Sequence, residues 1–377
     1  MPFDVSVVPC GSYDPDECRA ALSAALAPIG GLDWVRPGMR IAVKVNLVSA
    51  MRPDAAATVH PSLLTALTEL LRARGASITL GDSPGGLYTA AHLARVYDVC
   101  GLRQCEQAGA RLNLDISQIE AQFPEAVQAR RFTYTRWLDD ADAIIDFCKL
   151  KTHGMLAMTN ACKNFFGVIP GTMKSEYHYQ YPNTADFADM LVDLCEYFNP
   201  RLVLCDAVFG MEGNGPTQGH PRKIGTILAA KNAHKLDLAA SRLLGLTVQD
   251  VPTLSAALRR GLIPDSVDCL SVSGNLAAFA VPDFVVPAMR PDTAFARFGA
   301  LNRVIAAFLR PYPKLHAADC VGCKKCAGIC PAHAITMQKD KPQIDRRTCI
   351  HCFCCQEFCP KGALRVGRTA IARLLNK

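Results

Sequence analysis

The sequence of 377 residues predicts an α/β domain, with a largely parallel sheet and flanking helices, followed by a small cysteine-rich α+β domain. Two observations support this prediction. Short runs of β-branched residues alternate with longer segments of helical periodicity over the first 310 residues, as in domains whose parallel strands are joined by helices. By contrast, nine of the 18 cysteines lie between Cys320 and Cys359. We therefore expect two domains, at residues 1–310 and 311–377.

The elements of the first domain follow from periodicity and composition. Strands are expected at short apolar runs rich in Val and Ile, and helices where apolar residues recur three and four positions apart. The predicted strands are residues 40–47, 77–81, 143–148, 201–205 and 223–229. The predicted helices are residues 15–26, 61–74, 89–107 and 187–197. A further apolar stripe at helical spacing runs from 295 to 309, and the junction between the domains is predicted where it ends, at Pro311-Tyr312-Pro313.

The cysteine-rich segment contains the same motif twice. The pattern C-x2-C-x2-C-x3-C-P begins at Cys320 and again, 29 residues later, at Cys349. Three thiolates at this spacing can surround one [4Fe-4S] cluster, and in two-cluster ferredoxins the fourth cysteine ligates the other cluster. The segment therefore resembles a bacterial two-cluster ferredoxin domain, with two [4Fe-4S] clusters. One cluster is expected on Cys320, Cys323, Cys326 and Cys359, and the other on Cys349, Cys352, Cys355 and Cys330.

Two alternatives apply to individual cysteines. Zinc is a weaker interpretation of the motifs, because structural zinc sites usually have ligands in two pairs rather than a triplet with a remote fourth cysteine. Cys354 lies between ligands of the second motif and is interpreted as a packed bystander. The nine cysteines outside the motifs are scattered, and such thiols usually behave as small buried hydrophobes in a reducing cytosol.

The basic charge of the chain is concentrated in the same segment. The net charge is +7, and the residues from Pro311 onward contain 12 Lys and Arg against 4 Asp and Glu. Part of this excess offsets the negative charge of two clusters, and the remainder favours an acidic redox donor protein as partner. Because no basic helix or aromatic platform accompanies it, no nucleic-acid partner is expected.

Composition favours a cytoplasmic protein without a membrane partner. Half of the residues are apolar and 20% are charged, and no segment approaches the roughly 20 uninterrupted apolar residues of a membrane span. The first ten residues contain Asp4 and no basic stretch before an apolar run, unlike a secretory signal.

Polar residues of the first domain gather where predicted strands end, the usual place for sites in open α/β sheets. The glycines of the turn after Asp82 do not form G-x-G-x-x-G, and a plain turn also explains them. The polar segments are Lys44 with Asn46, residues 82–86, Lys149 with Lys151 and His153, residues 159–167 and residues 206–216.

These segments resemble the large family catalogued as domain of unknown function 362, which is often fused to a ferredoxin-like domain. The resemblance covers most of residues 1–310. Its marks are Lys44 and Asn46, then Lys151, Lys163, Asn164 and Gly167, and the segment from Gly210 to Pro216. The resemblance implies architecture more than chemistry, because the reaction of the family is generally unassigned.

The chemistry of the polar residues indicates their roles. Several cationic side chains near strand ends would suit a carboxylate, a phosphate or a developing enolate, although lone lysines are often solvated. The acidic residues could act as acid or base, or could cap helices and pair with the lysines. His153 and Cys162 could bind a metal, but a structural histidine is more common. We expect catalytic roles for Lys151, His153, Lys163, Asp206 and Glu212, and binding of ligand or cofactor by Lys44, Asn46, Asp82, Lys149 and Asn164.

The leading hypothesis is an iron-sulfur oxidoreductase, whose two clusters relay electrons to a small anionic substrate or cofactor in the α/β domain. The alternative is a non-catalytic electron carrier, or a metal-centre maturation factor, that docks a protein partner. A third hypothesis is a ligand-binding protein whose clusters are structural. No flavin or nicotinamide fingerprint is recognisable in the sequence.

Overall fold

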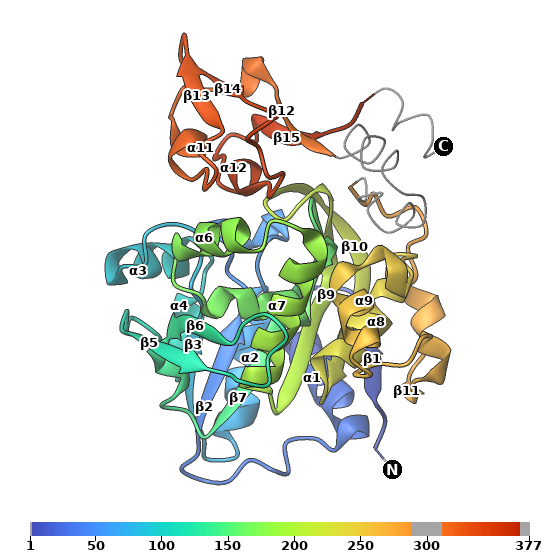
Figure 1. Cartoon of the computed structure of the whole chain (residues 1–377). Coiled ribbons are helices and arrows are strands. Elements are labelled where there is room, and N and C mark those ends of the chain that lie inside the picture. Colours follow the sequence, from blue (N-terminus) through green and yellow to red (C-terminus); the bar gives the residue numbers. More distant parts are fainter. Residues whose placement is uncertain (1, 288–310, 370–377) are drawn as a thin grey trace.

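The computed structural model describes residues 2–287, here called the α/β region, and residues 311–369, here called the cysteine-rich region (Figure 1). The helix expected at residues 295–309 and the domain boundary expected at residue 310 lie outside the described residues, so both stay predictions. Within the described ranges, no helix is long and apolar enough to cross a membrane.

The α/β region is built on a mixed sheet, which has nine strands among the described residues. Its central strands are parallel: β9 (Leu202–Asn214), β7 (Ala143–His153), β2 (Arg40–Val45), β3 (Ser77–Gly81) and β4 (Arg111–Leu112). β10 (Gln218–Ala230) pairs antiparallel with β9 and with β1 (Val5–Pro9). The short strands are β11 (Val272–Ser273), parallel to β1, and β8 (Ala157–Thr159), antiparallel to the end of β7. The predicted α/β fold with a largely parallel sheet is confirmed.

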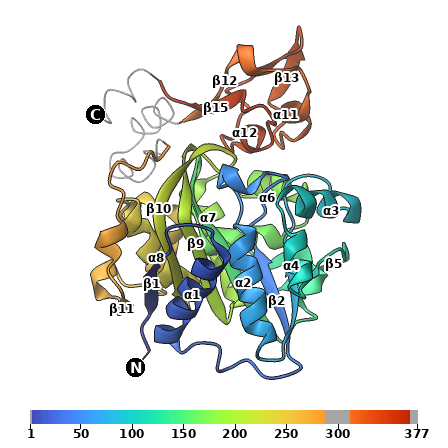
Figure 2. The ribbon, with the colours of Figure 1, turned by 180° about the vertical axis from the view of Figure 1, so that it is seen from behind.

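Helices cover both faces of the sheet, because successive residues of its central strands point to opposite sides and both sets are apolar. In β9, Leu204 packs into one core and Cys205 into the other. The first core lies under α1 (Pro15–Leu26), α2 (Pro61–Arg72), α3 (Ala90–Val99) and α4 (Arg103–Gln107), and Figure 2 shows α1 and α2 in front of the sheet. The second core lies under α5 (Ala161–Asn164), α7 (Thr184–Phe198), α8 (Ala233–Leu243) and α9 (Pro252–Arg259). These sides are called the α1 face and the α7 face.

Several elements differ from their predicted bounds, and β7 continues to His153, five residues beyond the strand expected at 143–148. The helix expected at 89–107 is divided into α3 and α4, because Gly101 between them adopts a left-handed φ of +76°. The strands expected at 201–205 and 223–229 are the inner parts of β9 and β10, which continue as one long hairpin. Residues 206–214, interpreted from the sequence as a loop, are therefore strand. β5 (Gln118–Gln122) and β6 (Arg131–Thr135) form a separate two-stranded sheet. A further helix is α6 (Met173–Gln180).

The cysteine-rich region repeats one unit, as its sequence predicts. Its strands are β12 (Tyr312–Leu315), paired with β15 (Leu364–Gly367), and β13 (Ile335–Gln338), paired with β14 (Lys341–Ile344). Each motif contains a short helix, α11 (Lys325–Gly328) or α12 (Cys354–Glu357). Left-handed residues also recur 29 positions apart, at Lys324 and Phe353 with φ of 63° and 64°. The repeat is therefore present in the backbone as well as in the cysteine spacing.

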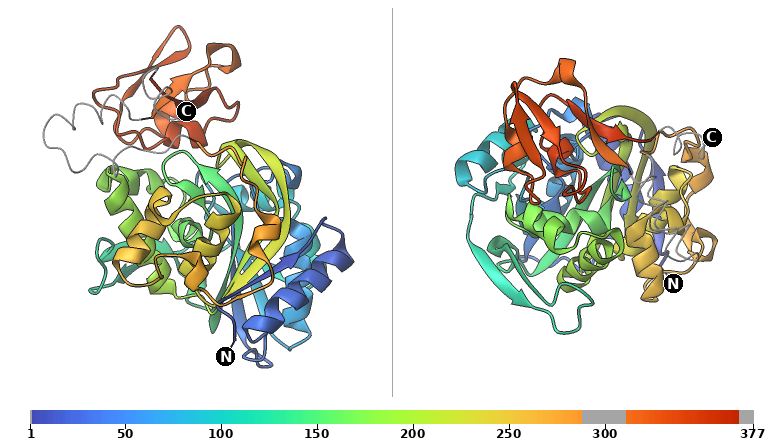
Figure 3. Two further views of the ribbon diagram at one scale, coloured as in Figure 1. Left: turned by 90° about the vertical axis from the view of Figure 1, so that its right-hand side faces the viewer. Right: turned by 45° about the horizontal axis from the view of Figure 1, so that its top comes forward.

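The cysteine-rich region lies at the edge of the sheet where the parallel strands end (Figure 1). The hairpin of β9 and β10 extends beyond the helical layers and meets α12, as the left view of Figure 3 shows. Gly85, in the turn after β3, lies under Phe358, and a Cβ on this glycine would be only 3.0 Å from the Phe358 ring. The polar strand ends of the α/β region therefore face the second cysteine motif.

Candidate functional site

The eight predicted ligand cysteines line two separate hollows. One, of about 370 Å³, is lined by Cys320, Cys323, Cys326 and Cys359, and the other, of about 310 Å³, by Cys330, Cys349, Cys352 and Cys355. Each hollow thus takes three cysteines from one motif and a fourth from the other, the division expected for two [4Fe-4S] clusters. Four converging thiols fit such a cluster. Cys354 also lines the second hollow, so its role as a bystander stays a prediction.

The two motifs differ in their surroundings. In the first, Cys323 is exposed and Val321 beside it is 62% exposed. In the second, Phe353 is 1% exposed and belongs to the core on the α7 face of the α/β region. The first motif therefore faces solvent, whereas the second is packed against the α/β region.

The turn of the β9–β10 hairpin binds the second motif through hydrogen bonds. The Gln356 side chain donates to the carbonyl of Asn214 over 2.9 Å, and the Gln218 side chain donates to the carbonyl of Cys359 over 3.0 Å. The Thr217 hydroxyl donates to the carbonyl of Glu357 over 3.2 Å. These bonds fix α12, which contains the predicted cluster ligand Cys355 and leads to Cys359, against the α/β region.

His153 of the α/β region meets Glu357 of the second motif at this junction. Glu357 Oε1 lies 3.0 Å from His153 Nε2, and both side chains are largely buried. His153 Nδ1 accepts hydrogen bonds from the backbone N–H groups of Met155 and Leu156, so the ring proton resides on Nε2, facing Glu357. Burial lowers the pKa of His153. Burial alone would raise the pKa of Glu357, but the opposing effects of His153 and Lys163 outweigh burial and lower the pKa to about 2. The junction therefore joins a carboxylate to a neutral imidazole.

A buried ion pair anchors the polar network on the α7 face. Lys44 Nζ lies 2.8 Å from Asp82 Oδ1, with side-chain exposures of 1% and 4%. Asp82 also accepts backbone N–H groups from Leu47 and Ser83, and Lys44 donates to Asn164 over 3.0 Å. A Cβ at Gly167 would collide with both charged groups, so close packing requires glycine there. The network thus joins the ends of β2 and β3 to α5.

Asn46 extends this network to Lys151. Its amide donates to Asn164 over 3.3 Å, and its carbonyl accepts from Lys151 Nζ over 2.6 Å. Lys151 also donates to the Ala57 carbonyl, in the segment between β2 and α2. Burial, with smaller effects from Lys149 and Lys163, lowers the pKa of Lys151 to about 7. At neutral pH this lysine can therefore either hold or release a proton.

A second ion pair lies on the α1 face. Lys149 Nζ is 2.8 Å from Asp206 Oδ2, and both side chains are buried. The Tyr13 hydroxyl donates to Asp206 over 2.9 Å and accepts from Lys149 over 2.7 Å. Tyr13 stacks on His60 with the ring centres 3.7 Å apart, and burial lowers the pKa of His60 to about 4. Lys149 and Asp206, predicted as members of one site, therefore pair with each other.

Two further lysines complete the cationic edge. Lys163 Nζ lies 4.3 Å from the centre of the Phe166 ring, and burial lowers its pKa. Lys174 donates to the Ser83 carbonyl over 2.7 Å, and burial lowers its pKa to about 7. Lys163 was predicted from the sequence, whereas Lys174, in α6, was not.

Two predicted residues have other neighbours. Glu212 accepts the backbone N–H of Val285 and lies 3.9 Å from Arg222, and none of its ion pairs or hydrogen bonds in the described residues reaches a lysine. Cys162 is not beside His153, which pairs with Glu357. The structure therefore does not bring His153 and Cys162 together as a possible metal site, because Cys162 lies beside Cys195 and His234 instead.

Sequence reasoning missed Glu357, Gln356, Tyr13 and Lys174. Tyr13 and Lys174 stand in segments without any motif and gave no signal, and Gln356 lies inside the second cysteine motif but not at a ligand position. Glu357 could have been noticed, since an acid between two cluster ligands adds negative charge beside a negatively charged cluster. The negative charge of Glu357 is stabilised when a hydrogen-bond donor of the α/β region, such as the His153 ring, faces the carboxylate.

The chain matches two known families. The family described as "Domain of unknown function (DUF362)" matches residues 41–242, and the 4Fe-4S dicluster domain matches residues 319–363. The curated "Thylakoid-associated protein sll1697" of Synechocystis sp. is 32% identical over 274 residues, which are 71% of this chain and 83% of that protein. The lactate racemase apoprotein of Thermoanaerobacterium thermosaccharolyticum is similar with a TM-score of 0.38 and 10% identity, over 62% of this chain and 55% of that one. This last likeness is too low to support an argument.

Proposed function

Because the chain belongs to the domain of unknown function 362 family and carries a 4Fe-4S dicluster domain after it, we propose that it is an iron-sulfur oxidoreductase. In this proposal, electrons enter through the exposed first motif and leave through the buried second motif. These electrons reduce a small anionic substrate or cofactor that the lysines hold at the sheet edge. The observation that carries the proposal is the burial of the second motif against this edge, through Phe353 and Glu357.

The exposed motif suits an encounter with a donor protein. Lys324 and Lys325 are exposed beside Val321, which gives the first motif a positive surface with an apolar centre. An acidic redox protein would be attracted to this surface, and the attraction would weaken as salt increases. A bound cluster would supply one-electron transfer there, and it would do so near the surface.

The sheet edge suits an anion. Lys44 and Lys149 each have a carboxylate partner, but Lys151 and Lys174 donate to neutral groups, and Lys163 lies over an aromatic ring. One buried lysine, Lys151, and two partly buried lysines, Lys163 and Lys174, have no ion-pair carboxylate among the described residues, which leaves positive charge for a ligand to neutralise. Lys163 lies close enough to Glu357 to lower its pKa, so the anion would bind next to the second motif.

Proton supply follows from the same lysines. The pKa of Lys151 near 7 allows it to deliver a proton to a substrate that gains electrons, and then to recover one from solvent. Burial of the edge beneath α12 excludes water and strengthens each charge interaction there. Asn46 and Asn164 hold the Lys44 and Lys151 side chains in one network, which limits their movement.

The test compares Lys163→Ala with Lys223→Ala, an exposed lysine of β10, in protein purified anaerobically. Small carboxylates and phosphate esters are screened by calorimetry, and cluster reduction is followed by visible absorbance. We expect wild type and Lys223→Ala to bind the same anion, and Lys163→Ala to lose about 3 kcal/mol of transition-state stabilisation, a rate loss of about a hundredfold. Cluster spectra should be unchanged in both variants.

The carrier hypothesis gives the opposite result. If no small anion binds wild type, and Lys163→Ala transfers electrons to every acceptor tried as fast as wild type does, the lysine edge is not a substrate site. The cytoplasmic location also stays a prediction, because the similar Synechocystis protein bears a name that associates it with thylakoids.

A further inference from the structure

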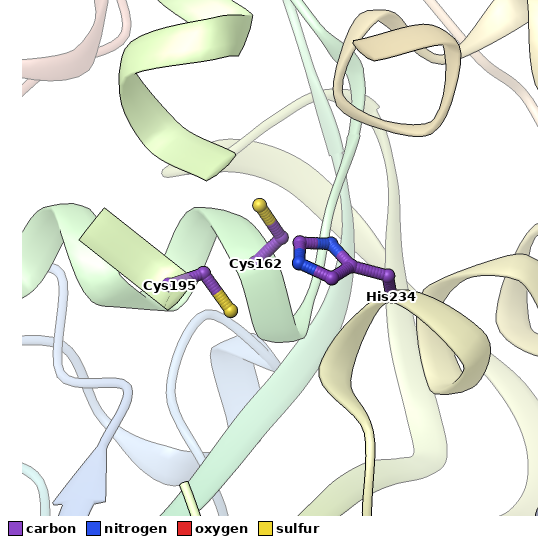
Figure 4. Close-up of side chains that lie close together, drawn as sticks. All are labelled: Cys162, Cys195 and His234. Carbon is purple, nitrogen blue, oxygen red and sulfur yellow. The ribbon is translucent and has the colours of Figure 1, made fainter. Parts of the chain in front are cut away.

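Three metal-ligating side chains meet in the α/β region, apart from the two cysteine motifs. Cys162 belongs to α5, Cys195 to α7 and His234 to α8 (Figure 4). Their ligand atoms, two sulfurs and one ring nitrogen, all lie within 4.8 Å of one another. The three residues are 0%, 2% and 1% exposed. Among the described residues, no other group of three such ligand atoms lies within this distance.

The size and composition of the group fit one metal ion. Ligand atoms of a tetrahedral zinc ion lie roughly 3.3–3.8 Å apart, so contraction by about 1 Å would complete the contacts. Zinc prefers sulfur and nitrogen ligands. Two thiolates and a neutral imidazole also cancel the charge of Zn²⁺, whereas a monovalent ion would leave a buried negative charge. Charge balance therefore favours a divalent ion.

Carboxylates hold the group in position. Glu196 Oε1 lies 3.0 Å from His234 Nε2 and fixes the plane of the imidazole. Asp237 accepts the backbone N–H groups of Ala161, over 2.8 Å, and of Cys162, over 3.0 Å. Since Asp237 and His234 share α8, the same helix supplies one ligand and anchors the backbone of another. The site is therefore preorganised before any ion binds.

Ordinary packing explains a buried cysteine but not this arrangement. Cys148 and Cys205 are also buried neighbours, paired in register on β7 and β9, and they belong to no group of three ligand atoms. The Cys162 and Cys195 pair differs because an imidazole nitrogen, on a ring held by a carboxylate, lies within 4.8 Å of both sulfurs.

We propose that Cys162, Cys195 and His234 bind one Zn²⁺ ion, with the fourth position taken by water. The ion would join α5 to α7 and α8 behind the sheet edge. Lys163 and Asn164 directly follow Cys162 in α5, so the ion would also fix the direction of the two side chains that enter the polar edge. The proposal does not depend on the function suggested for that edge.

The test uses the full chain, purified anaerobically from zinc-supplemented cultures and loaded with about eight iron per chain, so that zinc cannot occupy empty cluster motifs. Zinc is quantified, and its ligands are counted by X-ray absorption at the zinc edge. We expect about one zinc per chain, with two sulfurs at about 2.3 Å and nitrogen or oxygen at about 2.0–2.1 Å.

The matched variants are Cys195→Ala and Cys105→Ala, since both cysteines are buried and lie in helices of the α/β region. Cys195→Ala should lose at least tenfold in zinc affinity, while Cys105→Ala should keep the ion. If Cys195→Ala fails to fold, the absorption spectrum of wild type still decides. Four sulfur ligands, no zinc uptake by the iron-loaded wild type, or a disulfide between Cys162 and Cys195 found by alkylation and mass analysis would each overturn the proposal.

Discussion

The Lys44–Asp82 pair gives the sharpest prediction of stability, because it lies in the centre of the polar network. Replacing Asp82 by Asn keeps the shape of the side chain but removes its charge. Lys44, 1% exposed at its side chain, then keeps a positive charge without the carboxylate 2.8 Å away. Breaking a buried ion pair in this way typically costs about 3–5 kcal/mol. For a chain of this size, a loss of about 3–5 kcal/mol corresponds to a fall of about 6–20 °C in the thermal midpoint.

The assay is anaerobic thermal unfolding of the full chain, followed by far-ultraviolet circular dichroism. The control is Asp142→Asn, which removes the exposed partner of Arg40 and should leave the midpoint nearly unchanged. The double variant Lys44→Met with Asp82→Asn should recover much of the loss, since no unpaired charge remains. A midpoint within about 2 °C of wild type for Asp82→Asn, or no recovery in the double variant, would refute the reasoning.

Three further predictions follow from the junction, the edge and the motifs. Glu357→Ala should speed amide hydrogen exchange of the segment that begins at His153 by about ten- to hundredfold without loss of iron, and unchanged exchange would contradict the contact. Affinity for an anion should be flat below pH 7 and fall by up to about tenfold per pH unit above it, as Lys151 loses its proton; calorimetry in buffers of different ionisation enthalpy should show proton uptake on binding. Cys354→Ser should keep about eight iron per chain and Cys326→Ser about four, and equal losses would mean a different ligand set.

The sequence predicted the layers of the fold better than the ends of its elements. Apolar runs of β2 and β9 are buried on both faces, so a covered parallel sheet was the expected result. The long hairpin was missed because β9 contains Gly210 and Gly213, and β10 contains Pro221, residues that usually weaken a strand. This hairpin is stabilised at its end by the cysteine-rich region, a contact that no local pattern contains.

The candidate site was predicted as a set of residues but not as an arrangement. Lys44, Asn46, Lys151 and Asn164 do share one network, as their positions at strand ends suggested. Lys149 and Lys44 lie on opposite faces of the sheet, which the prediction did not separate. The face that each side chain reaches depends on the register between β2 and β7, and the sequence alone does not contain that register.

The two halves of the cysteine-rich repeat show what a sequence can reveal about docking. Residues at equivalent positions share a backbone conformation, so a difference in their chemistry reflects a difference in surroundings. Lys324 of the first half corresponds to Phe353 of the second, and both adopt the left-handed conformation that costs a non-glycine residue energy. Lys324 is exposed, whereas Phe353 is buried in the core of the α/β region. Gly328 likewise corresponds to Glu357, which faces His153. An apolar or acidic residue in one half, opposite a lysine or glycine in the other, therefore marks the half that docks, and this comparison needs no knowledge of the fold.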